Sequence, residues 1–178
     1  MIFKGRGQAR VFVTMLIFMV MAGVIIPRAT GVENHAEEVI AELTALNQAA
    51  IELALEAGQS EMLLQYGDID VSQSGIEFYI QNNSGEDYRY GYKGSLAKYD
   101  SGELTAVPVI VPSDLDSSLY RTVAGGTISR SAALLFHWYG TLPPGRYIYI
   151  REFLPINANQ PGEFLFLEFE ITEETPRF

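Results

Sequence analysis

Cysteine is absent from the 178-residue sequence. Disulfides, thiolate metal sites, a thiol nucleophile and a lipidated N-terminal cysteine are therefore excluded. Histidine is nearly absent as well, since only His35 and His137 occur. A serine triad would have to use His137, and Ser129 and Ser131 lie near it in sequence without the sharp nucleophile turn that such chemistry needs. We therefore expect that the protein is not an enzyme.

Basic residues are scarce: 12 Lys and Arg stand against 22 Asp and Glu, for a formal net charge of −10. Four of the bases lie within the first 31 residues, which contain no acid, so the rest of the chain has eight bases and a formal charge of −14. Binding to nucleic acid relies on clustered Lys and Arg. We expect no nucleic-acid partner.

Clustered metal ligands are missing too. Two Asp-x-Asp pairs come nearest to a calcium site: Asp68 with Asp70, and Asp114 with Asp116. Neither belongs to a ligand-rich loop with a following Glu, which such a site requires. Glu168 and Glu170 alternate as the solvated face of a strand does, and no sugar cleft accompanies them. We expect neither a metal nor a cofactor.

A long apolar run lies near the N-terminus, where residues 11–26 read VFVTMLIFMVMAGVII after three basic residues. This order is typical of an export signal, with small residues that permit cleavage after Gly31. A retained anchor is the alternative, although the run spans only about 24 Å as a helix, against roughly 30 Å of hydrocarbon core. We interpret residues 1–31 as a signal peptide or membrane anchor, which makes the membrane a partner and the remaining chain extracytoplasmic.

Residues 32–60 are expected to form an amphipathic helix. Asn34 and Glu37 resemble an N-cap with its reciprocal partner, and Gly58 provides a stop. The apolar residues that recur at spacings of three and four are Ala36, Val39, Leu43, Leu46, Ala50, Leu53 and Ala57. The stripe either packs on the following β domain or only spaces it from the membrane. Because the stripe is rich in Ala, we expect it to bury little area, so that the helix is a spacer that the domain does not need in order to fold.

Residues 66–173 show the short alternating segments of antiparallel strands. In residues 76–81, IEFYIQ, the apolar side chains face one way and Glu77, Tyr79 and Gln81 the other. Residues 132–139 are interpreted as another strand of this kind. The predicted core residues are Phe78, Phe136, Trp138, Leu167 and Phe169. Six or seven strands with no helix between them predict a mainly β protein, an antiparallel β-sandwich.

Three tyrosines form the candidate binding surface. Tyr88, Tyr90 and Tyr92 alternate with polar residues or glycine, so they share one face of a predicted strand. Packing in the core or at a sheet edge is the simpler interpretation. If the face is exposed instead, it forms an aromatic strip of the kind that binds carbohydrate or protein.

Several segments resemble a bacterial immunoglobulin-like domain family that is common in envelope proteins of Firmicutes. They are GIEFYIQNNSGEDYRYGY at residues 75–92, YGTLPPGRY at 139–147, which continues into Arg151-Glu152-Phe153, and EFLFLEFEI at 163–171. The resemblance covers residues 66–173 and implies an immunoglobulin-like sandwich that serves as an accessory module, with no catalytic residues. Leu104 departs from it, because the family usually has Trp there, and so does the long polar segment 113–127.

The sequence therefore predicts a non-catalytic, extracytoplasmic, immunoglobulin-like module with a binding or spacer role at the bacterial envelope, whose partner is an envelope protein or carbohydrate. A type IV pilin-like subunit is one alternative, with Gly5 or Gly7 ending its leader. The fifth residue after each glycine is Arg10 or Phe12, where most pilins have Glu. An envelope hydrolase is the second alternative.

Overall fold

The computed structural model describes residues 32–110, 120–157 and 161–176, with side chains from Ala36 onward. The predicted signal or anchor, residues 1–31, and the pair Asp114 and Asp116 lie outside the described residues. The chain divides into two compact units, Met1–Ala36 and Glu37–Phe178, and all the strands belong to the second. Across the described ranges, no helix is both long enough and apolar enough to cross a membrane.

Helix α2, Val32–Ala57, confirms the predicted helix. It ends where the sequence indicates, because Gly58 takes a φ of +83° that favours glycine. The amide of Gly58 donates to the carbonyl of Ala54 at 2.8 Å, which satisfies one of the carbonyls left free at the helix end.

The strands form two antiparallel sheets, which we call the small sheet and the large sheet. The small sheet has the order β1-β2-β7, with β1 at Leu63–Ser72, β2 at Gly75–Asn82 and β7 at Ile128–Ala133. The large sheet has the path β5-β4-β8-β3-β6, with β9 paired to β8. Its strands are β3 (Tyr88–Gly91), β4 (Ser95–Asp100), β5 (Glu103–Ala106), β6 (Tyr120–Val123), β8 (Gly145–Pro155) and β9 (Glu163–Ile171).

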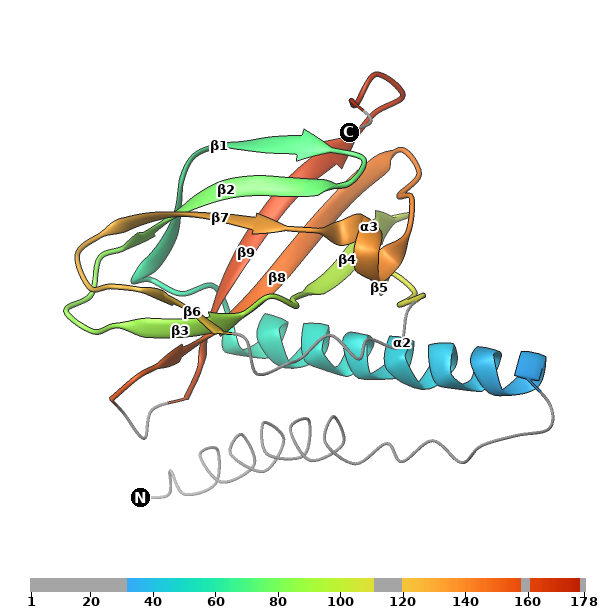
Figure 1. Cartoon of the computed structure of the whole chain (residues 1–178), viewed down its shortest axis with the longest axis horizontal. Helices are drawn as coiled ribbons and strands as arrows, with labels where there is room; N and C mark the ends of the chain where they lie inside the picture. The colour runs from blue at the N-terminus through green and yellow to red at the C-terminus, as the bar shows by residue number, and fades with distance from the viewer. Residues whose placement is uncertain (1–31, 111–119, 158–160, 177–178) are drawn as a thin grey trace. The chain divides into compact units, whose positions relative to one another are not determined.

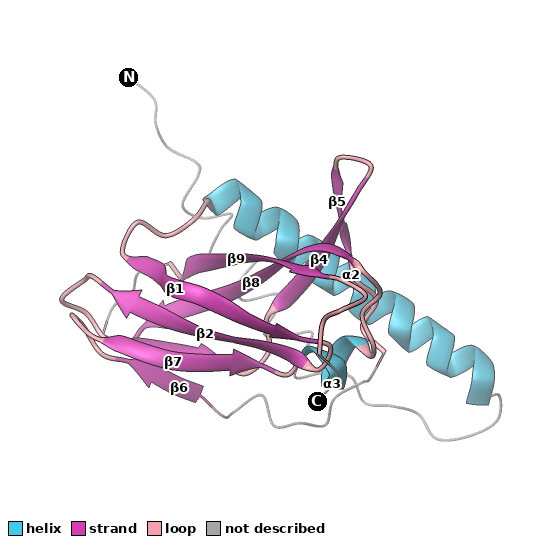
Figure 2. Ribbon diagram, turned by 90° about the horizontal axis from the view of Figure 1, so that it is seen from above, coloured by secondary structure: helices cyan, strands magenta, loops and turns pink. Residues whose placement is uncertain are grey.

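Strand β8 organises the large sheet. It pairs with β9 along one edge, while its other edge pairs first with β4 and then, near Pro155, with β3. The small sheet covers one face of the large sheet and α2 lies along the other (Figures 1 and 2). The mainly β architecture predicted from the sequence is confirmed at this level.

The main core lies between the two sheets and confirms four of the five predicted core residues. Phe78, Leu167, Phe169 and Trp138 are buried there. Phe136 was predicted wrongly, since 56% of it is exposed.

The cause of this error is a change of periodicity after β7. The chain forms the short helix α3, Leu135–Tyr139, instead of continuing as a strand. A helical period buries Leu135, Trp138 and Tyr139 together, whereas a strand would alternate. Phe136 and His137 therefore face solvent, whereas Leu135, Trp138 and Tyr139 do not.

Helix α2 packs on the large sheet through a face that overlaps the predicted stripe only in part, since Leu43 of the stripe packs half-buried against the main core. The buried residues are Asn47, Ile51 and Ala54, while Ala36 and Ala57 of the predicted stripe are exposed. The centre of the buried face is thus rotated from the stripe by less than the 100° of one residue, and stripe residues such as Leu46 and Ala50 stay half-buried at its side. From Glu37 onward the helix belongs to the same compact unit as the strands, so it is a layer of the domain rather than a detached spacer.

Asn47 explains the rotation, because a polar residue occupies the centre of the buried face. Its side-chain amide donates to the carbonyl of Leu96 at 3.1 Å and to that of Val107 at 3.2 Å. An apolar periodicity cannot detect this face, since its central contact is a pair of hydrogen bonds to the sheet.

Candidate functional site

The predicted tyrosine strip does not form a continuous surface. Tyr88 and Tyr90 are each only 3% exposed, because the alternation of β3 directs both into the core. Tyr92 lies beyond the end of β3 at Gly91 and is 46% exposed. The strip interpretation is therefore corrected, and the core alternative holds for Tyr88 and Tyr90.

The Tyr88 hydroxyl has a structural partner. It donates to Oε1 of Glu163 at 2.6 Å, and the other oxygen of this carboxylate accepts from the Ser60 hydroxyl. Burial and the neighbouring Glu163 carboxylate raise the pKa of Tyr88 to about 12. This contact joins β3 to the start of β9 and to the segment before β1.

Tyr92 is paired with an arginine from the adjacent strand. The Arg121 Nε donates to the Tyr92 hydroxyl at 3.1 Å, and its guanidinium lies 5.1 Å from the centre of the Tyr92 ring. A cation over an aromatic ring at an exposed site is worth about 0.5–1 kcal/mol. The pair occupies part of the ring that a ligand would otherwise contact.

A larger exposed aromatic surface lies elsewhere, on the face of the small sheet that points away from the large sheet. Tyr66 on β1 is directly opposite Tyr79 on β2, and they are 51% and 43% exposed. Two residues further along the same face, Gln81 of β2 has Leu64 of β1 as its partner on one side and Ile128 of β7 on the other. We call the exposed apolar residues of this face the outer patch: Met62, Leu64, Tyr66, Tyr79 and Ile128.

The register of the small sheet creates the outer patch. Ile76, Phe78 and Ile80 of β2 are buried against the large sheet, so the intervening Tyr79 must point outward. Cross-strand neighbours share a face, so the partners of Tyr79 on both sides, Tyr66 and Arg130, are exposed with it.

Charges of both signs border the outer patch. Arg130 forms an ion pair with Glu77, and this carboxylate holds the pKa of Arg130 above its ordinary value. Asp70 lies opposite Glu77 in the register of β1 and β2. These three residues are one base and two acids, so the border is net negative, as the chain is.

A buried arginine joins the sheet under the outer patch to the large sheet. Arg151 of β8 is 1% exposed, and its Nη1 donates to the hydroxyl of Ser131 on β7 at 2.8 Å. Its Nη2 donates to the Tyr149 hydroxyl at 2.6 Å and to the carbonyls of Ala132 and Tyr92 at 3.2 and 3.3 Å. These bonds connect both sheets through one side chain.

Aromatic rings complete the surroundings of Arg151. The guanidinium carbon lies 5.4, 5.2 and 5.1 Å from the ring centres of Phe78, Tyr90 and Tyr149. Among the described residues, no carboxylate forms an ion pair with Arg151. Ring faces and hydroxyl and carbonyl oxygens thus replace a counterion, and every buried side-chain polar atom of the described part has a partner.

The residues considered for catalysis are not assembled into a site. The Ser131 hydroxyl is committed to Arg151, and His137 lies on α3 with its ring edge-on to Trp138. Glu168 accepts hydrogen bonds from Tyr99 and Arg146 on the surface. Within residues 32–110, 120–157 and 161–176, no group of three His, Asp or Glu is placed to hold a metal ion. The side chain of His35 lies outside the described residues.

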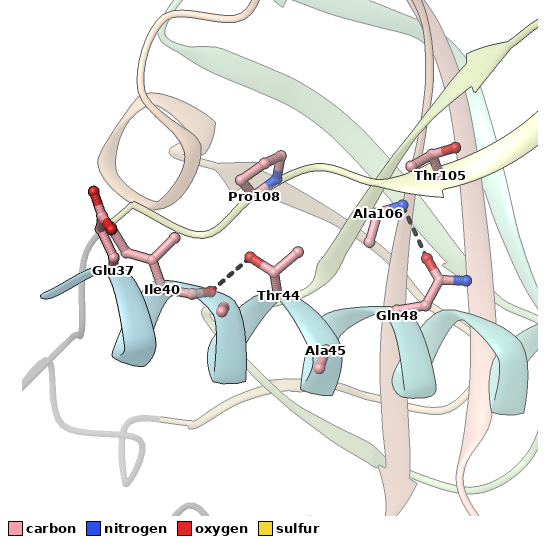
Figure 3. Close-up of a pocket in the computed structure, with 9 residues that line it drawn as sticks. Glu37, Ile40, Thr44, Ala45, Gln48, Thr105, Ala106 and Pro108 are labelled. Atoms are coloured by element: carbon pink, nitrogen blue, oxygen red, sulfur yellow. Dashed lines mark hydrogen bonds between the residues drawn. The ribbon is translucent and has the colours of Figure 1, made fainter. Parts of the chain in front are cut away.

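An open groove of about 570 Å³ lies between α2 and residues 105–108 (Figure 3). Two of its polar side chains, Thr44 and Gln48, are already used within the fold. The Thr44 hydroxyl donates to the Ile40 carbonyl at 2.7 Å, and the Gln48 side-chain oxygen accepts from the Ala106 amide at 3.0 Å. The remaining walls are largely apolar, so the groove has few groups to orient a polar ligand.

Sequence comparison adds no relatives: no protein-family model matches this chain, and no curated protein matches it. The outer patch, identified from the register and exposure of the small sheet, is therefore the candidate functional surface.

Proposed function

We propose that this protein is a non-catalytic, extracytoplasmic binding module of the bacterial envelope, an immunoglobulin-like sandwich that binds through its outer patch. The observation that carries this proposal is the exposure of Tyr66 and Tyr79 side by side on a sheet whose other face is fully packed. Tyrosine and methionine are enriched in binding surfaces, and here the underlying sheet holds them in place.

The turn before β8 supports the immunoglobulin-like assignment. The Tyr147 hydroxyl donates to the carbonyl of Pro143, four residues upstream, at 2.6 Å. A tyrosine near the start of a central strand that bonds back to the preceding backbone resembles the tyrosine corner of immunoglobulin-like sandwiches. Leu142 is buried beside it, which gives the Leu-Pro-Pro-Gly-Arg-Tyr segment a structural rather than a chemical role.

The extracytoplasmic location rests on the sequence. The basic residues and apolar run within residues 1–31 have the order of an export signal or anchor, and the absence of cysteine is compatible with either compartment. Neither the location nor the bacterial source affects the geometry of the outer patch.

The pilin-like alternative gains one observation, which is that α2 packs along an antiparallel sheet through Ile51 and Ala54. It lacks the glutamate expected five residues after Gly5 or Gly7. The intact mass of the protein recovered from membranes separates the two, because prepilin processing would remove only the first few residues.

Tyrosine nitration, mapped by mass spectrometry, tests the binding proposal. We expect Tyr66 and Tyr79 to react in the dilute purified chain and to be protected in native envelopes. Tyr92 and Tyr120 are comparably exposed away from the outer patch, so they should react in both preparations. Equal nitration of Tyr66 and Tyr79 in the two preparations contradicts the proposal.

A further inference from the structure

A second group of exposed apolar side chains lies at one end of the domain, around α3. Among the described residues, Leu134 and Phe136 are the large hydrophobic side chains with the highest exposed fractions, 68% and 56%. Ile110 is 47% exposed and lies against the same helix, because its amide donates to the carbonyl of Trp138 at 2.9 Å. We call Ile110, Leu134 and Phe136 the α3 tip.

The backbone holds the α3 tip in place. The amide of Phe136 donates to the carbonyl of Ser74 at 3.0 Å, and its carbonyl accepts from the amide of Gly140 at 2.9 Å. The helical period turns Leu135 and Trp138 into the core, so the Phe136 side chain cannot join them unless α3 unwinds. Apolar side chains that protrude from a fixed backbone mark a contact surface.

The chain enters the domain at this same end. The part of α2 that belongs to the domain begins at Glu37, and Glu37 and Ile40 line the open groove together with Pro108 (Figure 3). Pro108 is two residues before Ile110, so the first turns of this part of α2 lie at the α3 end, as Figure 1 shows.

This entry point ties the α3 end to the apolar run of residues 11–26. Between the run and Ile40 lie residues 27–31 and about two turns of helix, which together span at most about 30 Å. If residues 1–31 are a retained anchor, the tether therefore leads from the bilayer to the end of the domain that has the α3 tip.

We propose that the α3 tip rests on the lipid bilayer, with its three side chains inserted at the boundary between headgroups and acyl chains. The inference takes the retained-anchor interpretation of residues 1–31. It goes beyond the proposed function, because it concerns a surface other than the outer patch.

The side chains at this end suit that boundary. Leucine and phenylalanine are the residues that bury apolar area there, and Leu134 and Phe136 are the most exposed members of the α3 tip. Beside them, the Nζ of Lys93 lies 5.3 Å from the centre of the Trp138 ring. Lysine and tryptophan both favour the headgroup region, the lysine by keeping its charge in water.

The size of the α3 tip favours a bilayer over a protein partner. Helix α3 has only five residues, whereas a stable protein interface buries about 800 Å² on each partner. A bilayer needs no matching surface, and the tether raises the local concentration, so that weak insertion suffices. The formal charge of −14 beyond residue 31 repels anionic lipid, so apolar insertion rather than headgroup charge supplies the attraction.

The absence of cysteine permits a fluorophore at one chosen position. The full chain in phosphatidylcholine vesicles would carry His137→Cys with an environment-sensitive label, because His137 is exposed on α3 next to Phe136. Ala124→Cys, also at an exposed position, is the matched control. It lies at the other end of β2, since Asn82 there donates to the carbonyl of Thr127.

We expect the label at residue 137 to emit at shorter wavelength than the label at residue 124 in vesicles recovered by flotation. Nitroxide-labelled phosphatidylcholine should quench it several-fold more strongly. Adding Leu134→Ser and Phe136→Ser should remove most of this quenching. Leu55→Ser with Ile156→Ser, at exposed apolar residues away from α3, should leave it unchanged. All four side chains are exposed, so these variants should keep the urea midpoint of their parent.

Equal quenching at residues 137 and 124 in floated vesicles overturns the inference, as does strong quenching that survives Leu134→Ser with Phe136→Ser. A chain that does not float overturns it too, because the tether is then missing. None of these results changes the nitration of Tyr66 and Tyr79, so a failure here is distinguishable from a failure of the binding proposal.

Discussion

The large sheet is covered on its two faces by layers of different chemistry. Toward the small sheet it presents a thick aromatic core, in which Tyr147 stacks on Phe169 with ring centres 5.6 Å apart and Arg151 bonds to both sheets. Toward α2 its fully buried side chains are small or aliphatic, with the half-buried rings of Tyr99, Phe164 and Phe166 beside them. Asn47 supplies the central polar contact. The large sheet is therefore bound to the small sheet by aromatic packing and by the hydrogen bonds of Arg151. On its other face it is covered by a helix that packs close to it.

From this difference we expect that a helix with few fully buried residues still matters to the domain. The α2 layer covers Ile148 and Ile150 in the middle of β8, which would otherwise lie exposed on a sheet face. Large exposed apolar patches promote association of monomeric proteins. The helix thus contributes by covering the sheet as well as by the area that it buries itself.

Removing residues 32–59, and with them helix α2, should have the largest effect on the large sheet, because it removes one of its two covering layers. We expect the remaining chain to lose cooperative unfolding and to aggregate, because the face of β8 with Ile148 and Ile150 becomes exposed. A urea titration followed by the fluorescence of the single Trp138 measures this. A cooperative transition with the midpoint of the full chain would instead restore the spacer interpretation.

Arg151→Met tests the aromatic side. The substitution leaves the hydroxyls of Ser131 and Tyr149 and the carbonyl of Ala132 without their buried donor. We expect the free energy of unfolding to fall by about 3 kcal/mol, measured by urea denaturation. Arg121→Met, at an exposed arginine, is the control and should change stability little. An unchanged or higher stability in Arg151→Met would mean that desolvation of the cation outweighs its hydrogen bonds.

Asn47→Ala tests the helix side with a smaller effect. It removes the hydrogen bonds to the carbonyls of Leu96 and Val107 while keeping a good helix former. The Val107 carbonyl loses its side-chain donor, while the Leu96 carbonyl keeps the Val107 amide at 2.9 Å, so the free energy of unfolding should fall by about 1–2 kcal/mol. Glu42→Ala, on the exposed side of α2, should leave the urea midpoint nearly unchanged. Equal effects of the two substitutions would show that Asn47 does not anchor the helix.

Glu152→Gln should have the smallest effect, and its sign depends on pH. By alternation along β8, Glu152 shares the face of Ile148 and Ile150, and burial raises the pKa of its carboxyl above 4.5. A raised folded-state pKa favours the folded chain when the carboxyl is protonated, so its contribution is lost as pH rises through that pKa.

Stability of the unmodified chain should therefore fall with pH over the range just above 4.5 at this site, and Glu152→Gln should remove that part of the slope. Thermal unfolding of both chains across this range provides the measurement. Glu170→Gln, on an exposed position of β9, serves as the control. A slope that is identical in Glu152→Gln and the unmodified chain contradicts the assignment.

Simple periodicity predicted the parts of the fold where one chemistry repeats. The alternation of residues 76–81 correctly placed Phe78 inside and Tyr79 outside, and Gly58 correctly ended α2. It failed where a polar residue is buried, as at Asn47, and where a short helix interrupts a strand pattern, as at Phe136.

Only part of the outer patch could be predicted from the sequence. The outward direction of Tyr79 follows from its apolar neighbours, but its partner Tyr66 lies on a strand that is not regular, because the pairing shifts between Tyr66 and Asp70. Nothing in the alternation of β3 distinguishes an exposed tyrosine strip from a buried one. Only the packing of β3 against Phe153 and Glu163 decides that Tyr88 and Tyr90 are core residues.

The irregularity of β1 affects whether the edge of the small sheet can pair with a strand of another molecule. Between Tyr66 and Asp70 the strand bulges against β2, and Gly67 takes a φ of +71°. A bulged edge cannot offer an unbroken row of amides and carbonyls to an incoming strand. The β1 edge is thus a poor template for a strand of another molecule, so copies of the chain are kept from extending along it into a continuous cross-β ribbon. The exposed tyrosines of the outer patch therefore do not make that edge prone to amyloid formation.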